Sequence, residues 1–331
     1  MKVREKIALI TGINGQDGSY LAEHLVSLGY QVHGTMRLSS MHNADKMVNL
    51  KNVSGKIKIH PCGLTDHLSV YKLISKIKPD ECYHLAAASF VSYDFNDELS
   101  IISTNFNPTH YLLSAIKELV PSCKFYFSGS SEMFGNTDAS PQNEETKFNP
   151  RSIYGIAKTS GFYVVRNYRE HHGIYACTGI TYNHESSRRD FSFVTRKIST
   201  GVAKIYLGSA DHIELGNIDA VRDWGYAPEY VVAMQKMLNN PKGPTDYVIS
   251  TGKTNSVKHF LDLAFSTVNL DYKKYLKTND FFFRPSEKVI LRGDSQKIGD
   301  DLGWKSEKKI EEIVEEMVFN DIALLKDREK R

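Results

Sequence analysis

Three features that would place a chain in a special class are scarce or missing here. The four cysteines, at positions 62, 82, 123 and 177, form no Cys-x-x-Cys pair, so we expect reduced structural thiols and no metal site. No apolar run approaches the roughly 20 residues that span a bilayer, and the charged N-terminus does not predict a signal peptide. A net charge of +3 is too small to favour nucleic acid or a membrane as partner. These absences predict a cytoplasmic protein.

What the sequence does contain is a regular alternation of strand-like and helix-like patterns. Helical spacing, for example at 68–77 and 109–119, separates the apolar runs. The predicted strands lie at 7–10, 31–36, 56–60, 81–86, 124–128 and 176–182. This alternation predicts an α/β fold with a doubly wound parallel sheet.

The alternation stops after residue 182. Short strands at 212–215 and 247–250, and helices at 257–268 and 308–325, predict a smaller region over the carboxyl edge of the sheet. Ligands bind at that edge in open α/β sheets. We therefore expect a nucleotide-binding domain at 1–182 and a mainly substrate-binding domain at 183–331 that is partly interleaved with it.

The first predicted strand runs directly into a glycine-rich turn at 11–18 and then into a helix. Gly12 permits the tight turn, Gly15 lets the backbone approach a pyrophosphate, and Gly18 lets the helix pack close to the strand. The helix N-terminus then faces the phosphates. The pattern predicts a Rossmann dinucleotide site that also includes Gln16 and Asp17.

The end of the second strand indicates which dinucleotide binds. An NAD-selective site usually has an acidic residue here for the ribose 2′-hydroxyl, and this chain has none. Arg37 stands there instead, followed by Ser39 and Ser40, and a cation with hydroxyls suits a 2′-phosphate. We expect NADP rather than NAD; the simpler alternative is that Arg37 is a solvated loop residue.

Four residues form a candidate catalytic set. Tyr154 and Lys158 are four apart and share one face of a helix, where the ammonium can lower the tyrosine pKa toward neutrality. The Ser130 hydroxyl can hold the same substrate oxygen. Glu132 adds a carboxylate that simple alcohol oxidation does not need. The set therefore predicts hydride transfer followed by a second acid–base step.

A group of cations follows residue 182. Any one of them alone is more simply a surface ion pair, but together they can clamp a second diphosphate. They are Arg188, Arg189, Arg196, Lys197, Arg222 and Arg284. Glu287 can take a ribose diol.

Several longer motifs resemble one family. They are Thr-Gly-x-x-Gly-Gln-Asp-Gly-Ser-Tyr-Leu-Ala-Glu from residue 11, Pro-Arg-Ser-x-Tyr-Gly from 150, Asn-His-Glu-Ser from 183, Thr-Arg-Lys-Ile-Ser from 195, Arg-Asp-Trp-Gly from 222 and Leu-Gly-Trp-Lys from 302. In them the chain resembles the extended short-chain dehydrogenase/reductases, and among these the GDP-mannose 4,6-dehydratase family. The Asn-His-Glu-Ser string is far more specific than the glycine turn.

The resemblance implies a mechanism for a GDP-hexose. Tyr154, as phenolate, removes the C4 hydroxyl proton while a hydride passes from C4 to NADP⁺. Glu132 removes the C5 proton, and the C6 hydroxyl leaves as water, helped by Glu132 or Tyr154 as acid. The hydride then returns to C6, so no net oxidation occurs. Ser130 hydrogen-bonds O4, and Lys158 holds the cofactor ribose.

The resemblance also implies binding residues and an assembly. For NADP it implies Leu64, Leu85, Ala86, Ser89, His184 and Arg189. For the GDP-sugar it implies Asn183, Lys197, Leu215, Gly216, Arg222, Arg284 and Glu287, with Ala88 and Phe90 beside the hexose. It further implies a homo-oligomer, dimer or tetramer.

Some positions depart from the family pattern. Ala88 and Phe90 replace a glutamine and a histidine, so we expect GDP-mannose to be a poorer substrate than a C2-modified or chain-extended sugar, such as GDP-N-acetylglucosamine or a GDP-heptose. Gly63 replaces an aspartate that faces adenine, and Leu38 replaces the second arginine of a pair that contacts NADP across subunits. Serine at 130 replaces threonine and keeps the hydroxyl.

Two other function classes stay open. An epimerase, reductase or decarboxylase of the same superfamily would share the fold, and Glu132 argues against the first two but not against a decarboxylase. A non-catalytic NADP-binding regulator would have no use for an intact Ser130, Tyr154 and Lys158.

Overall fold

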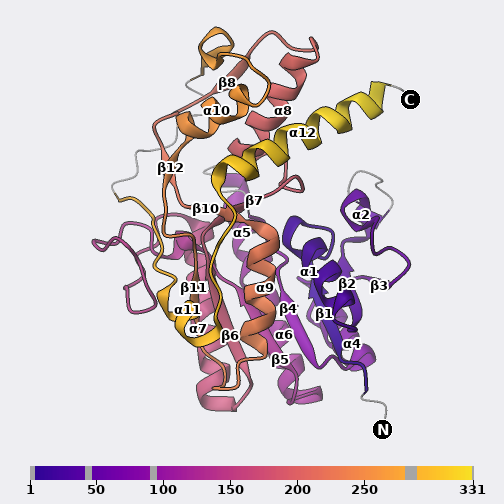
Figure 1. The fold of residues 1–331 in the computed structure, drawn as a ribbon. Coiled ribbons are helices and arrows are strands. Elements are labelled where there is room, and N and C mark those ends of the chain that lie inside the picture. The colour runs from indigo at the N-terminus through magenta and orange to yellow at the C-terminus, as the bar shows by residue number, and fades with distance from the viewer. Residues whose placement is uncertain (1–3, 42–46, 90–94, 280–288, 330–331) are drawn as a thin grey trace.

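The computed structural model describes residues 4–41, 47–89, 95–279 and 289–329. Its centre is a seven-stranded sheet in the order β11-β6-β5-β4-β1-β2-β3, with every neighbouring pair parallel (Figure 1). The strands are β1 (Ile7–Thr11), β2 (Gln31–Met36), β3 (Ile57–Pro61), β4 (Glu81–His84), β5 (Lys124–Ser128), β6 (Ala176–Thr181) and β11 (Tyr247–Ile249). The predicted α/β fold with a doubly wound parallel sheet is confirmed.

Helices cover both faces of the sheet. One face carries α1 (Gln16–Ser27) and α9 (Ala227–Leu238), and the other carries α4 (His67–Ile77), α6 (Asn107–Leu119) and α7 (Ile153–His172). Strand β1 shows why the sequence folds this way. Ala8 and Ile10 pack toward the α1 layer and Leu9 toward the opposite layer, and all three are completely buried.

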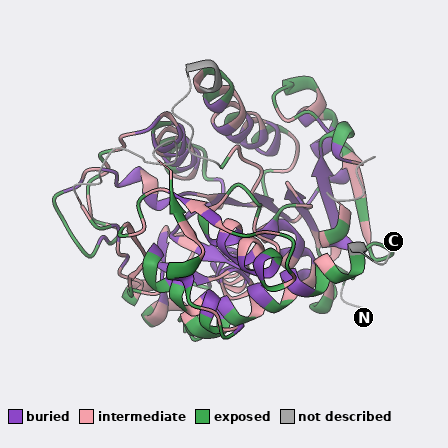
Figure 2. Cartoon of the chain, turned by 90° about the horizontal axis from the view of Figure 1, so that it is seen from above, coloured by how far each residue is buried: buried purple, intermediate pink, exposed green. Residues whose placement is uncertain are grey.

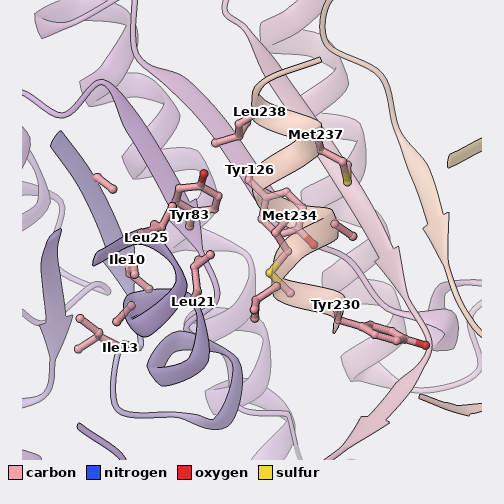
Figure 3. Packing of buried hydrophobic residues seen from close by; sticks show 14 of the residues in the cluster. Ile10, Ile13, Leu21, Leu25, Tyr83, Tyr126, Tyr230, Met234, Met237 and Leu238 are labelled. Carbon is pink, nitrogen blue, oxygen red and sulfur yellow. The ribbon is translucent and has the colours of Figure 1, made fainter. Parts of the chain in front are cut away.

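The core beneath the α1 layer joins distant parts of the chain. Leu21 of α1 and Met234 of α9 belong to one buried cluster with Ile10 and Tyr126 of the sheet (Figure 3). Seen from above, the buried residues lie mainly in the sheet and on the inner faces of its helices (Figure 2). This cluster fixes α9, which follows residue 182, onto the first region.

The predicted strand at 247–250 forms, but in the central sheet rather than in the smaller region. As β11 it pairs with β6, and α11 (Gln296–Leu302) packs nearby. The physical reason is that both faces of this edge strand pack in the core: Tyr247 and Ile249 belong to one buried cluster and Val248 to another, and all three are 0% exposed. A run of three apolar residues is too short to reveal which sheet it joins. The two regions are thus interleaved more deeply than the boundary at 182 suggests.

The smaller region lies over the carboxyl edge of the sheet. Its core packs α8 (Val194–Tyr206), α10 (Val257–Ser266) and α12 (Ile310–Glu329) against one another (Figure 1). Three two-stranded sheets join it to the cleft: β7 (Asn183–Glu185) with β10 (Trp224–Tyr226), β9 (Val221–Arg222) with β12 (Asn255–Ser256), and β8 (Ile213–Leu215) with β13 (Leu276–Thr278).

The remaining elements are short, apart from one helix. They are α2 (Leu38–Met41), η1 (Val48–Leu50), α5 (Phe95–Asn105), η2 (Ser131–Met133) and η3 (Tyr272–Lys274). All four cysteines are buried and unpaired, as expected. Within the described residues, no helix is both long enough and apolar enough to cross a bilayer.

Candidate active site

One large cleft opens at the carboxyl edge of the sheet. Its volume is about 2430 Å³, well above the roughly 300–1,000 Å³ typical of a pocket for one small ligand. Its lining includes the glycine turn and Tyr154 on the sheet side, and Lys197 and Arg222 on the other side. The cleft therefore has room for two extended ligands, one against each wall.

The glycine turn has the geometry of a phosphate cradle. Gly12 adopts φ +71°, and a Cβ there would lie 2.9 Å from the Ala86 Cα. A Cβ at Gly18 would lie 2.3 Å from the Gly12 carbonyl oxygen, so α1 can start this close to β1 only with glycine. The N-terminus of α1 faces the cleft, where its free N–H groups favour an anion.

Thr11 fixes the neighbouring strand exit, a role that the sequence analysis did not assign. Its Oγ1 accepts hydrogen bonds from the Leu85 and Ala86 backbone amides, each at 3.1 Å. Leu85 and Ala86 line the cleft, as do Leu64 and Ser89. These residues therefore lie on the same side of the cleft as the glycine turn. Their predicted contacts with the cofactor stay predictions.

The predicted catalytic residues come together in the middle of the cleft. Ser130 precedes η2 and accepts a hydrogen bond from the Glu132 backbone amide at 3.2 Å. Tyr154 and Lys158 lie in the first turns of α7, which begins after the Ser152 cap. The Lys158 ammonium is 5.8 Å from the centre of the Tyr154 ring and donates to the Ser128 carbonyl at 2.7 Å.

Burial controls the acid–base state of this group. It raises the pKa of Tyr154 to about 12, although a hydrogen bond with Ser130 and the charge of Arg189 act in the opposite direction. Burial also lowers the pKa of Lys158 to about 8. The expected lowering of the Tyr154 pKa toward neutrality is therefore not found in this structure, because loss of water outweighs the helpful neighbours.

Asp17 and His184 form a buried ion pair between the glycine turn and β7. The His184 Nε2 lies 2.8 Å from an Asp17 carboxylate oxygen, and its Nδ1 lies 2.7 Å from the Tyr182 carbonyl oxygen. Because both ring nitrogens face acceptors, both must carry hydrogens. Burial opposes the charge of each group. The partner's charge nevertheless raises the pKa of His184 and lowers that of Asp17.

Gln16 completes this connection. Its side-chain amide donates to the His184 carbonyl at 3.0 Å, and its oxygen accepts from the Ser186 hydroxyl at 2.9 Å. Hydrogen bonds therefore connect the glycine turn with β7 and the residue that follows it. The residues Gln16, Asp17 and His184 also line the cleft. Their predicted contacts with the cofactor stay predictions.

The cations of the opposite wall divide into two kinds. Arg188 donates to Ser19 and, at 2.6 Å, to Glu23 of α1, and Arg196 pairs with Asp321 of α12 at 2.6 Å. These two guanidinium groups are committed to carboxylates of the protein, so the expected clamp of six is too large. The pairing could not be seen in the sequence, because the partners lie more than a hundred residues away.

Of the other cations, Arg189 is also paired with a carboxylate of the protein. Arg189 lies 3.2 Å from Glu185 and stacks on the Phe193 ring at 3.6 Å. Lys197 and Arg222 line the cleft, together with Asn183, Leu215 and Gly216. Their predicted contacts with a GDP-sugar stay predictions. Arg284 and Glu287 lie outside the described residues.

The residues predicted to select NADP directly follow β2. Arg37 is exposed and lines the cleft at the end of β2. Ser40 lines it too, whereas Ser39 is exposed and does not. Lys51, which the sequence analysis did not single out, adds a second cation to this lining.

The residues expected beside the hexose are placed less favourably. Ala88 does not line the cleft; its backbone exchanges two hydrogen bonds with the Asn105 side chain, at 2.7 and 3.1 Å. Phe90 lies outside the described residues. The expected preference for a modified sugar therefore has no support from Ala88.

Asp223 is a buried carboxylate that the sequence analysis left without a role. It is 0% exposed and accepts hydrogen bonds from Thr251, from the Gly252 amide and from the Gly293 amide. It follows Arg222 directly and joins its own segment to residues 251–252 and to Gly293. The sequence signal that could have indicated a role for Asp223 is its place next to an arginine in a polar motif.

Comparison with known proteins adds three kinds of match. Residues 9–317 match the family model described as GDP-mannose 4,6 dehydratase. A GDP-mannose 4,6 dehydratase of Drosophila melanogaster is 40% identical, with 98% of this chain and 88% of that protein covered. The GDP-mannose 4,6 dehydratase 1 of Arabidopsis thaliana is 43% identical (98% and 92% covered), and the Vibrio cholerae GDP-mannose 4,6-dehydratase is 38% identical (97% and 94% covered).

Solved structures share the fold at lower identity. A UDP-glucose 4-epimerase of Thermotoga maritima superposes with a TM-score of 0.84 at 22% identity, covering 96% of this chain and 99% of that one. A dTDP-glucose 4,6-dehydratase of Bacillus anthracis in complex with NAD has a TM-score of 0.83 at 16% identity, covering 98% of both. At these identities the likeness speaks for the fold alone.

Proposed function

Since the chain belongs to the GDP-mannose 4,6-dehydratase family, we propose that it removes water from GDP-mannose with the help of bound NADP and the residues Ser130, Glu132, Tyr154 and Lys158. Membership makes it a lyase of nucleotide sugars. The observation that carries the proposal is that these four side chains, contributed by β5–η2 and by α7, line one cleft beside a phosphate-binding turn.

The residues present suit a nicotinamide dinucleotide. The cradle at Gly12 and Gly18, which a Cβ would fill, leaves the backbone open to a pyrophosphate. Arg37, Ser40 and Lys51 supply cations and a hydroxyl that suit the 2′-phosphate of NADP. When bound, NADP would supply the oxidised acceptor for the C4 hydride and, in its reduced form, the donor for C6.

Each protein group has a defined proton to hold or move. Tyr154 Oη takes the proton of the C4 hydroxyl, and Ser130 Oγ, already bonded to Tyr154, orients that oxygen. Lys158, anchored on the Ser128 carbonyl, places a cation beside the Tyr154 ring. The carboxylate of Glu132 takes the C5 proton, which the new C4 ketone acidifies. The C6 hydroxyl then leaves as water with a proton from Glu132 or Tyr154 acting as the acid.

The opposite wall is proposed to hold the GDP moiety. Lys197 and Arg222 offer cations for its diphosphate, and Asn183, Leu215 and Gly216 complete that side of the cleft. The cytoplasmic location and the homo-oligomeric state stay predictions.

Mass spectrometry of a sugar panel tests this function. The enzyme with NADP should convert GDP-mannose to a product that is lighter by one water, and GDP-N-acetylglucosamine and a GDP-heptose test the earlier expectation of a modified sugar. A product of unchanged mass and altered stereochemistry would mean an epimerase. A product that has lost carbon dioxide would mean a decarboxylase acting on another sugar.

A further inference from the structure

The last helix takes part in the cleft. The family match ends at residue 317, yet Asn320, Leu324 and Asp327 of α12 line the cavity beyond it. Asp321, in the middle of this stretch, is only 2% exposed and lies among the helices of the smaller region. An acidic side chain is rarely buried so completely without a specific partner.

Arg196 is that partner. Its guanidinium nitrogen lies 2.6 Å from an Asp321 carboxylate oxygen, and the two side chains are 3% and 2% exposed. The second carboxylate oxygen accepts from the hydroxyls of Ser199 at 2.6 Å and Thr200 at 3.1 Å. Three residues of α8 therefore face the Asp321 carboxylate, and the side chain of Asn320 on α12 also favours its charged form.

The same guanidinium reaches the loop that precedes α8. Its other terminal nitrogen donates to the Ser187 carbonyl oxygen, and its centre lies 4.7 Å from the centre of the Phe191 ring. A planar guanidinium can hold two acceptors in fixed directions at once, which a lysine ammonium does with less geometric control. Arg196 thus joins α12 on one side to residues 187–191 on the other.

The loop at 187–191 contributes directly to the cleft. All five of its residues are part of the cavity wall, and Arg189 within it exerts its charge on both Tyr154 and Asp17. Lys197, next to Arg196, lines the same wall. A shift of this loop would therefore reach the proposed cofactor and substrate contacts together.

We propose that Asp321 is a positioning residue: by holding Arg196, it fixes the loop at 187–191 and the start of α8 so that Arg189 and Lys197 meet their ligands. The inference rests on the proposed function for the identity of those ligands, NADP and GDP-mannose. It gives the C-terminal helix a part in ligand binding without contact to the reacting atoms.

A double variant separates positioning from stability. Arg196→Met with Asp321→Leu replaces the buried pair by apolar side chains, an exchange that often leaves stability unchanged. We expect at most a modest fall in the melting temperature, since the Ser187 carbonyl and the hydroxyls of Ser199 and Thr200 lose their partners. The Kd for NADP, measured by calorimetry, and the KM for GDP-mannose should each rise about tenfold or more, because small displacements of binding groups cost that much. Values within twofold of the parent would overturn the proposal.

Arg196→Lys tests the same link in a milder way. The lysine keeps a cation opposite Asp321 but cannot also hold the Ser187 carbonyl with the same geometry. We expect a normal melting temperature and a raised Kd for NADP. An unchanged Kd and KM in this variant would likewise overturn the proposal, so a poorly folded double variant does not leave it undecided.

A second buried pair serves as the matched control. Arg169 of α7 and Asp246 lie 2.6 Å apart with 17% and 13% exposure, and neither lines the cleft. Arg169→Met with Asp246→Leu should lower the melting temperature, because the Thr178 amide loses its acceptor, but leave the Kd and KM unchanged. An equal rise in Kd in this control would mean that general destabilisation is responsible.

Failure of the proposed function would be visible separately. If the parent does not dehydrate GDP-mannose, the proposed reaction is wrong. Calorimetric titrations of the parent and the variants with NADP and with GDP still decide the role of Asp321, because they need no turnover.

Discussion

The two walls of the cleft are held in place by different interactions. The sheet wall, formed by the carboxyl ends of β1, β2, β4 and β5 with the first turns of α1 and α7, rests on backbone hydrogen bonds and an apolar core. The loop wall, residues 183–197, rests on side-chain pairs to other elements: His184 to Asp17, Arg188 to Glu23 and Arg196 to Asp321. In the proposed function, the first wall carries the reacting groups and the second holds the ligands against them.

The difference predicts different responses to mutation. Substitutions at the reacting groups of the sheet wall should change the rate of reaction and leave the fold intact. Substitutions in the pairs of the loop wall should change binding, stability and their pH dependence, because side-chain charges hold that wall in addition to the backbone pairing of β7 with β10.

The largest effect is expected at Tyr154. Tyr154→Phe removes the group that takes the C4 hydroxyl proton, so kcat/KM for GDP-mannose should fall by roughly 10²–10⁴-fold. Tyr163→Phe on the same helix removes an exposed hydroxyl and serves as the control. Steady-state kinetics of both variants measure the effect. Equal activity of Tyr154→Phe and the control would remove Tyr154 from the mechanism.

A pH profile of kcat/KM examines the same wall without mutation. The active form needs the Tyr154 phenolate, whose pKa of about 12 lies above the pKa of Lys158 at about 8. The phenolate fraction grows by about tenfold per pH unit, while the ammonium is lost at the same rate above pH 8. We therefore expect kcat/KM to rise up to about pH 8 and then level off. Measured with saturating NADP, a flat profile between pH 6 and 8 would show that the bound cofactor depresses the Tyr154 pKa below that range.

The loop wall is tested by Asp17→Asn. The raised His184 pKa gives stability that is complete below the ordinary value of 6.5 and is lost as pH rises through the folded value. The lowered Asp17 pKa gives stability that is present above 3.8 and is lost as pH falls through the folded value. The pair therefore stabilises the protein between those two folded values.

Asp17→Asn should lower the free energy of unfolding at neutral pH by about 2 kcal/mol, because a neutral His184 keeps only one donor. Denaturation with urea across pH measures this loss and the expected flattening of the pH dependence. Glu170→Gln, which removes an exposed partner of Arg166, should leave stability nearly unchanged. If Asp17→Asn were as stable as this control at every pH, the ion pair would not stabilise the loop wall.

The smallest effect is expected at Arg37. Arg37→Ala should weaken NADP binding by about tenfold and leave NAD binding nearly unchanged, since only NADP carries the 2′-phosphate and Lys51 retains a cation nearby. Calorimetric Kd values for both cofactors decide this. Arg166→Ala, which changes an exposed side chain of α7, serves as the control. Equal weakening of both cofactors would mean that Arg37 does not distinguish them.

The same contrast explains what the sequence could predict. The strand, glycine turn and helix at 7–27 follow from local periodicity and from Gly12 and Gly18, so the sheet wall was predictable. The pairs of the loop wall join residues up to 167 positions apart, and no local pattern signals them. The strand β11 was assigned to the wrong region for a related reason. A run of three buried residues is too short to show a periodicity that indicates which sheet it joins. Burial of Tyr154, which sets its pKa, likewise depends on tertiary packing.

Solvent-deuterium exchange with Glu132→Gln tests the central claim most directly. In deuterated water with NADP, the parent should release a product that has lost one water and carries deuterium at C5. The variant should still oxidise C4 once, seen as reduced nicotinamide, but incorporate no deuterium at C5 and lose no water, because an amide cannot accept the C5 proton. Full dehydration and C5 labelling by Glu132→Gln would contradict the account.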